Sequence, residues 1–137
     1  NEPGHHTTFL FNYAGKPWRT QELNRLIQTT MYTTLPDGIC GNEDCGQMSA
    51  WYIFSAMGFY PVNPADLKYQ FGSPLVKEAR IEVAPGKYFT VKAPEASATY
   101  LYMKAATLNG QLLDRTYITH DEIMAGGTLE FTMSDKR

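Results

Sequence analysis

Apolar residues in the first part of the chain recur at the spacing of an α-helix. A short apolar and aromatic stretch at residues 5–12 ends near Gly15, and a glycine just past a helix commonly terminates it. Pro17 suits the first turn of a second helix, which extends over roughly 14 residues at the 3.6-residue period. This helix is predicted to be amphipathic, with Leu23, Leu26, Ile27 and Met31 on its apolar face and Glu22, Asn24, Arg25 and Gln28 on its polar face.

A third helix is predicted from about residue 47 to residue 57, and it has almost no polar face. A helix that is apolar all round has to be buried on all sides. The other two predicted helices are too few to cover this one on all sides. Its neighbours must therefore come from the second half of the chain, from a partner chain or from residues outside this sequence.

From residue 69 onward the hydrophobic period changes to two. Asn109-Gly110 is a favoured two-residue hairpin turn, because both positions tolerate positive φ. Alternating stretches predict strands at residues 79–83, 88–92, 99–104, 117–119 and 128–133. The fold class is therefore predicted to be α+β, with helices in residues 1–62 and an antiparallel, sandwich-like β segment in residues 63–137.

Composition and charge narrow the functional classes. The 137 residues are 43% hydrophobic and 13% aromatic, which is typical of a globular chain with a core. The net charge of -2 and the scattered Lys and Arg residues argue against nucleic acid as a partner. No apolar run approaches the ~18 residues that span a bilayer, so no membrane interaction is expected. The opening Asn1-Glu2-Pro3-Gly4, without an initiator Met, indicates a piece of a longer protein or a processed N-terminus.

The most informative stretch for chemistry is the glycine-rich loop at residues 37–47. It places the adjacent carboxylates of Glu43 and Asp44 beside Asn42, just ahead of the apolar helix. Glycine lets a backbone approach a ligand closely, and a helix N-terminus favours an anion. On local sequence alone, Asp44 either presents its carboxylate to water or a metal, or serves as the N-cap of the helix.

Two cysteines, Cys40 and Cys45, lie five positions apart in the same loop. A disulfide across so short a loop is compatible with a secreted protein, and the sequence leaves their redox state open. Cys-x4-Cys without a nearby His is a poor zinc pattern.

A second polar cluster consists of Asn1, Glu2, His5 and His6. Asn and Glu oxygens suit calcium, although six to eight oxygens exceed what this cluster supplies. Adjacent histidines lack the i, i+4 spacing of a helical zinc site, and such pairs more often form structural hydrogen bonds.

Aromatic residues near both clusters could stack on sugars, but most are expected in the core: Phe9, Phe11, Tyr13, Trp18, Trp51, Tyr52, Phe59 and Tyr60. Residues 120–122 are predicted to form a turn.

A series of ordered motifs resembles glycoside hydrolase family 92. The motifs are NEPGHH at 1–6, FNYAGKPW at 11–18, TQE at 20–22, PDG at 36–38, GNEDCGQMSAWY at 41–52, GFYP at 58–61 and GSPL at 72–75. The resemblance covers nearly the whole chain and is strongest in residues 1–75. It implies the C-terminal part of a calcium-dependent, inverting exo-α-mannosidase. In this family an N-terminal β-sandwich precedes an (α/α)6 barrel, so residues 1–62 would be the last barrel helices.

The resemblance also implies roles for individual residues. Asp44 matches the general base, while Asn42 stands where many members have Asp, so Asn42 would orient water or the sugar without sharing the base role. The general acid is a Glu upstream of this chain, and inversion requires both groups. The isolated chain is therefore expected to be inactive. The calcium ligands would include Asn1, Glu2 and Asp44, and the residues supporting the site or contacting substrate would be His5, His6, Glu43 and Gln47.

The expected partners are a mannose-containing glycan, from N-glycans or mannan, and the remainder of the parent polypeptide. A homo-oligomer would also cover uncovered faces of the apolar helix. The resemblance implies an exported bacterial enzyme at a periplasmic, cell-surface or secreted location. The alternatives are a non-catalytic carbohydrate-binding or structural module and a calcium-binding structural domain.

Overall fold

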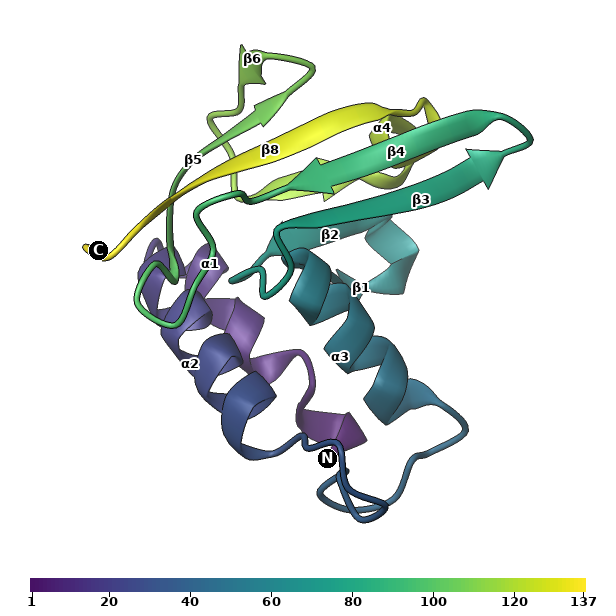
Figure 1. The fold of residues 1–137 in the computed structure, drawn as a ribbon, viewed down its shortest axis with the longest axis vertical. Helices are drawn as coiled ribbons and strands as arrows, with labels where there is room; N and C mark the ends of the chain where they lie inside the picture. Colours follow the sequence, from purple (N-terminus) through teal and green to yellow (C-terminus); the bar gives the residue numbers. More distant parts are fainter.

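The helices of the first half of the chain and the five-stranded sheet occupy opposite ends of the molecule. The computed structural model describes all of residues 1–137, and Figure 1 shows a helical layer beneath two layers of strands. The helical elements are η1 (Glu2–Gly4), η2 (Thr7–Phe9), α1 (Leu10–Tyr13), α2 (Pro17–Thr30), α3 (Gln47–Met57), η3 (Pro64–Asp66) and α4 (His120–Met124). The strands are β1 (Phe59–Asn63), β2 (Lys68–Phe71), β3 (Glu78–Ala84), β4 (Lys87–Lys92), β5 (Tyr102–Leu108), β6 (Gln111–Leu112), β7 (Tyr117–Thr119) and β8 (Gly127–Ser134). The predicted α+β class is confirmed.

The strands form two sheets that enclose a common core. One sheet has the order β1-β2-β7 and the other has the order β3-β4-β8-β5-β6. Phe71 of the first sheet packs edge-to-face on Phe131 of the second, with ring centroids 5.2 Å apart. Phe59, Ile118, Phe89 and Leu129 belong to the same buried cluster. The segment is therefore sandwich-like, as predicted.

One strand pairing differs from the prediction of antiparallel strands throughout. β4 and β8 run parallel, with Val91 opposite Leu129, so the five-stranded sheet is mixed. The predicted hairpin turn is confirmed, because Asn109 and Gly110 have φ values of 51° and 81° and join β5 to β6. The turn predicted at residues 120–122 is instead the start of α4, since Thr119 and Glu122 form a capping box.

Helix α2 has the predicted length, but the prediction of its buried face was wrong. The polar residues Asn24, Arg25 and Gln28 are buried in the chain, whereas Leu26 is 55% exposed and Met31 is 48% exposed. The side-chain amides of Asn24 and Gln28 are buried without a hydrogen-bond partner in the chain, but other residues of the buried face meet backbone groups. For example, the Thr20 hydroxyl donates to the Thr8 carbonyl at 2.8 Å, and the Gln21 side chain accepts from the backbone N–H of Met103 at 3.0 Å. Leu26 and Met31 of the predicted apolar face thus lie on the outside of this chain, whereas Ile27 packs against the buried Phe9 and Trp51.

Helix α3 is also only partly covered. Trp51, Ser55 and Ala56 are buried, but Ile53 is 58% exposed beside the similarly exposed Leu35. Gly58 ends the helix in a left-handed conformation with φ 99°, and its N–H bonds back to Phe54 and Ser55, so the chain turns directly into β1. None of the helices has the length and apolar character needed to cross a bilayer.

The outward apolar face of α2 leads to a first prediction. If other parts of a longer parent polypeptide cover this face, Leu26→Gln will destabilise the parent by about 2 kcal/mol, the cost of losing a buried leucine side chain. The same substitution in the isolated chain will leave the free energy of unfolding nearly unchanged, because Leu26 already faces solvent there. Thermal denaturation of both forms, with and without the substitution, measures the difference. An equal effect in both forms would show that nothing covers the face.

Candidate functional site

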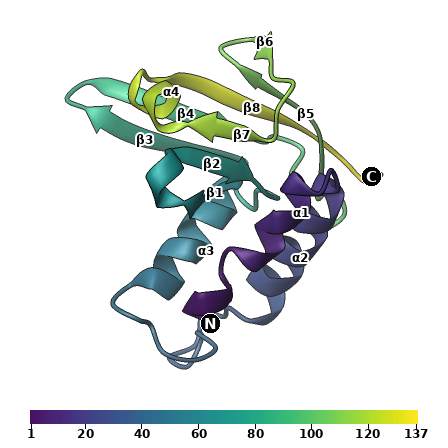
Figure 2. The same cartoon turned by 180° about the vertical axis from the view of Figure 1, so that it is seen from behind.

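The two polar clusters singled out in the sequence lie at the same end of the helical layer. We call residues 1–6 the N-terminal segment and residues 37–46 the acidic loop. In Figures 1 and 2 the N-terminus lies beside the connection between α2 and α3, at the end of the helices far from the five-stranded sheet. This proximity agrees with a shared site.

An unusual backbone conformation marks the end of the acidic loop. Asp44 and Cys45 have φ values of 52° and 57°, and Gly46 follows at 93°. Left-handed conformations of residues other than glycine are uncommon and are concentrated at functional sites. The Asp44 carbonyl accepts the N–H of Gln47 at 3.2 Å. Its carboxylate is exposed and accepts no hydrogen bond within the chain.

The two neighbouring carboxylates have different structural roles. Glu43 Oε1 accepts the backbone N–H of Ser49 at 3.0 Å, so Glu43 satisfies a donor in the first turn of α3. The N-cap residue itself is Gly46, and no side chain caps it. The interpretation of Asp44 as the helix cap was therefore wrong, and the structure leaves the Asp44 carboxylate available for chemistry.

His5 anchors the N-terminal segment to α3. The Trp51 indole stacks on its ring at 5.4 Å, and Trp51 Nε1 donates to the His5 carbonyl at 3.1 Å. Gln47 Nε2 lies 3.3 Å from His5 Nδ1. Burial is the main cause that lowers the pKa of His5, while the Asp44 carboxylate opposes this shift. Asp44 is thus near enough to act electrostatically on His5.

Tyr60 joins the same group from β1. Gln47 Nε2 donates to the Tyr60 hydroxyl at 2.8 Å. Burial raises the pKa of Tyr60, the hydrogen bond from Gln47 lowers it, and the Glu2 carboxylate raises it further. The Tyr60 ring packs on Phe9 with centroids 5.3 Å apart, which fixes its position.

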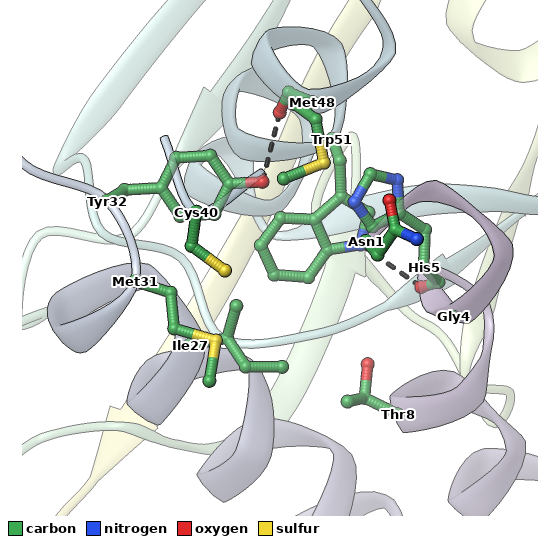
Figure 3. Close-up of a pocket in the computed structure, with 10 residues that line it drawn as sticks. All are labelled: Asn1, Gly4, His5, Thr8, Ile27, Met31, Tyr32, Cys40, Met48 and Trp51. Carbon is green, nitrogen blue, oxygen red and sulfur yellow. Dashed lines mark hydrogen bonds between the residues drawn. The ribbon is translucent and has the colours of Figure 1, made fainter. Parts of the chain in front are cut away.

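Two cavities flank His5. The first, of about 310 Å³, has polar walls formed by Glu2, His5, His6, Gln47 and Tyr60; its other lining residues are Ala50, Phe54, Pro61, Val62 and Pro64. The second, of about 100 Å³, is lined by Asn1, Gly4, His5, Thr8, Ile27, Met31, Tyr32, Cys40, Met48 and Trp51. Figure 3 shows Trp51 in the middle of this second group, with Met31 and Ile27 on the side of α2.

The smaller cavity is lined mainly by apolar residues, and one of its hydroxyls is already engaged. The Tyr32 hydroxyl donates to the Met48 carbonyl at 3.1 Å, and burial is the main cause that raises the pKa of Tyr32 to about 12 (Figure 3). Cys40, on its wall, and Cys45 are both free, exposed thiols. The larger cavity is therefore the better candidate for a polar ligand.

The structure brings together some of the predicted site residues. Glu2, His5, His6 and Gln47 share the larger cavity, whereas Asn1 lines the smaller one. The acidic loop residues Asn42, Glu43 and Asp44 line neither cavity. The sequence had indicated Tyr60 only as an aromatic residue of the core. Its position thirteen residues from Gln47 carries no local signal of the hydrogen bond between them.

The chain alone does not assemble a metal centre. No three His, Cys, Asp or Glu side chains lie close enough together to hold a metal ion. Asn1 Oδ1 accepts the backbone N–H of Glu2 at 3.1 Å, which uses one of the two lone pairs of this oxygen. Calcium requires six to eight oxygens, and the residues present do not meet that need.

Comparison with known proteins assigns the chain to a class of carbohydrate-cleaving enzymes. Residues 1–135 match the catalytic domain of a glycosyl hydrolase. The chain belongs to glycosyl hydrolase family 92. It is 33% identical over 136 residues to an uncharacterized secreted glycosidase of Arthroderma benhamiae, covering 97% of this chain and 18% of that protein.

Two solved structures from Bacteroides thetaiotaomicron have nearly the same fold. The family GH92 α-mannosidase BT3965, in complex with mannoimidazole, matches with a TM-score of 0.94 and 43% identity over 99% of this chain. The family GH92 inverting mannosidase BT2199 matches with a TM-score of 0.92 and 45% identity, also over 99%. The chain spans 18% of the length of each of these proteins.

Proposed function

We propose that this chain forms part of the catalytic site of an inverting exo-α-mannosidase and supplies its general base, Asp44. The observation that carries the proposal is the state of Asp44: its carboxylate is exposed and unpaired, at a left-handed position of the acidic loop. The likeness over almost the whole chain to an inverting mannosidase supports the reaction class.

Inversion assigns each proton in the proposed reaction. A carboxylic acid protonates the departing glycosidic oxygen while a carboxylate removes a proton from the water that attacks the opposite face of the sugar, with roughly 6.5–9.5 Å between the two groups. Asp44 takes the proton from water. Asn42 can orient this water or the sugar, because its amide hydrogen-bonds but does not accept a proton at neutral pH. Glu43 neighbours the base and is engaged by the N–H of Ser49, so it is not the proposed acid. The family resemblance implies that the general acid is a Glu upstream of this chain.

The larger cavity fits the polar part of a mannose-containing glycan, such as an N-glycan or mannan. Carboxylate and imidazole groups from Glu2 and His6 line it together and can hydrogen-bond sugar hydroxyls. Its remaining walls are apolar, as is usual for a small-molecule site that uses few polar groups for orientation.

Calcium is a further part of the proposal, although the chain does not by itself fit the ion. We propose that Asn1, Glu2 and Asp44 contribute oxygens to a shell that the remainder of the parent polypeptide completes. When bound, the ion would polarise water and sugar hydroxyls. The proton transfers described above do not depend on it.

The remainder of the parent is also the proposed partner for the uncovered apolar faces of α2 and α3. Helices of an (α/α)6 barrel would cover Leu26 and Ile53, which are more than half exposed here. A homo-oligomer is the competing way to cover them. The proposed location is outside the cytoplasm, periplasmic, cell-surface or secreted, in keeping with the secreted fungal relative.

The proposal is tested by assaying the parent protein and purified residues 1–137 on an aryl α-mannoside. The parent is expected to release β-mannose and to lose turnover on chelation, with recovery on adding calcium. The isolated chain is expected to show no turnover, because it lacks the general acid. Circular dichroism verifies that the chain is folded. Turnover by the isolated chain would contradict the missing acid, and an inactive parent that still binds mannosides would favour the non-catalytic carbohydrate-binding alternative.

A further inference from the structure

The N-terminal segment and the acidic loop do not hydrogen-bond to each other directly. All side-chain hydrogen bonds that join residues 1–6 to the rest of the chain end on His5, and their partners are Gln47 and Trp51 of α3. If Asp44 and Glu2 act on one substrate, as the proposed function requires, the hydrogen bonds of His5 tie the segment that carries Glu2 to α3.

Gln47 lies at the junction of these groups. Its side-chain nitrogen lies 3.3 Å from His5 Nδ1 and 2.8 Å from the Tyr60 hydroxyl, and its backbone N–H donates to the Asp44 carbonyl. One residue thus contacts the base-bearing loop, the N-terminal segment and β1.

The chemistry of the amide also orients His5. A side-chain NH2 group has two hydrogens and donates both, so the His5 Nδ1 and the Tyr60 oxygen act as acceptors. The proton of neutral His5 is then on Nε2. Trp51, four residues after Gln47 on the same helix face, stacks on the ring and prevents it from turning over.

From this geometry we propose that Gln47 is a positioning residue, which fixes the distance between the Asp44 carboxylate and the segment that carries Glu2. The inference rests on the proposed function, because the distance matters only if both residues act on one substrate. Gln47 lies on the wall of the larger cavity and is only partly buried, so water can replace its hydrogen bonds when the amide is removed. Its loss should therefore change geometry more than stability.

The test uses the full-length parent and the variant Gln47→Leu, which keeps the side chain's bulk and removes both hydrogen bonds. We expect kcat to fall by about 10- to 100-fold, the usual effect of losing a residue that orients a catalytic group. KM should change by less than about threefold, because uniform binding of the substrate is not affected. The matched control is Gln28→Leu, a glutamine buried in α2 away from both cavities, for which kcat should be unchanged.

Tyr60→Phe completes the experiment, because it removes one of the two acceptors and keeps the ring. If the two residues act as one unit, the double variant Gln47→Leu/Tyr60→Phe will lose no more kcat than Gln47→Leu alone. If the double variant instead loses the product of the two single-variant losses in kcat, the two residues do not share one role. A wild-type kcat for Gln47→Leu would overturn the inference altogether.

The variant Asp44→Asn in the same series distinguishes failure of the proposed function from failure of the present inference. If Asp44→Asn is fully active, the proposed function fails; if it is inactive while Gln47→Leu is normal, only the present inference fails.

Discussion

Replacing Asp44 by asparagine in the parent protein is expected to lower kcat by about 10²- to 10⁴-fold, the usual contribution of a positioned general base. The substitution preserves size and tolerates the left-handed backbone at this position, because Asn and Asp are the residues that adopt it most readily after glycine. Steady-state kinetics on an aryl α-mannoside measures the loss.

The neighbouring carboxylate provides the matched control for Asp44. Glu43→Gln removes an equal charge one residue away, but Glu43 accepts the N–H of Ser49 and helps to cap α3. This variant should keep most of its activity and lose less than about 1 kcal/mol of stability, because the amide oxygen of glutamine can still accept this N–H. Equal losses of activity in both variants would show that net charge, and not a specific base, matters.

Rescue of an Asp44 variant by azide provides a second test of the general-base role. In Asp44→Ala, azide can attack the anomeric carbon without giving up a proton, while the general acid still protonates the leaving oxygen. Turnover should therefore rise with azide concentration and yield β-mannosyl azide, the inverted product. An α-configured product, or no rescue in a folded variant with an otherwise intact site, would contradict the assignment.

The largest loss of stability is expected for Arg25→Met. The Arg25 guanidinium is buried without a carboxylate, and it donates to the carbonyls of Ser97 at 2.5 Å and Pro74 at 2.6 Å and to the Ser73 hydroxyl at 2.9 Å. Burial lowers its pKa from the ordinary value. Removing it leaves buried acceptors unpaired and separates α2 from the strand segment, which should cost about 3–5 kcal/mol.

Arg19 on the same helix is the control for Arg25. Its guanidinium pairs at the surface with Glu22, three residues away, at 2.9 Å. Exposed pairs of this kind contribute about 0.3–0.5 kcal/mol, so Arg19→Met should barely change thermal denaturation. Similar shifts for both variants would mean that Arg25 does not hold the two halves of the chain together.

The sequence predicted local structure better than it predicted which surfaces meet. The length of α2 and the Asn109-Gly110 turn follow from short-range periodicity and turn chemistry, and both are confirmed. The buried face of α2 was predicted wrongly, because a hydrophobicity pattern assumes an apolar core. Here the buried Arg25 meets backbone carbonyls, while the matching apolar surface for Leu26 is not within the chain.

Some features of the candidate site likewise follow from local sequence, and others depend on the tertiary structure. The residue types and spacing of the acidic loop identified the candidate carboxylates, but Glu43 and Asp44 are equivalent on local sequence. Only the backbone dihedrals and the Ser49 contact assign one to the helix and leave the other free. The hydrogen bond from Gln47 to Tyr60 depends on how β1 returns past α3, which is a tertiary feature without a local signature.

The position of β8 has a consequence for how the protein is made. This strand, residues 127–134, lies in the middle of its sheet, between β4 and β5, although it follows every other strand in the chain. During synthesis β4 and β5 therefore leave the ribosome without the strand that joins them, and Phe89 and Val91 remain open to water until it arrives. Such long-range pairing delays folding, so the nascent segment should depend on chaperones until residue 134 has emerged.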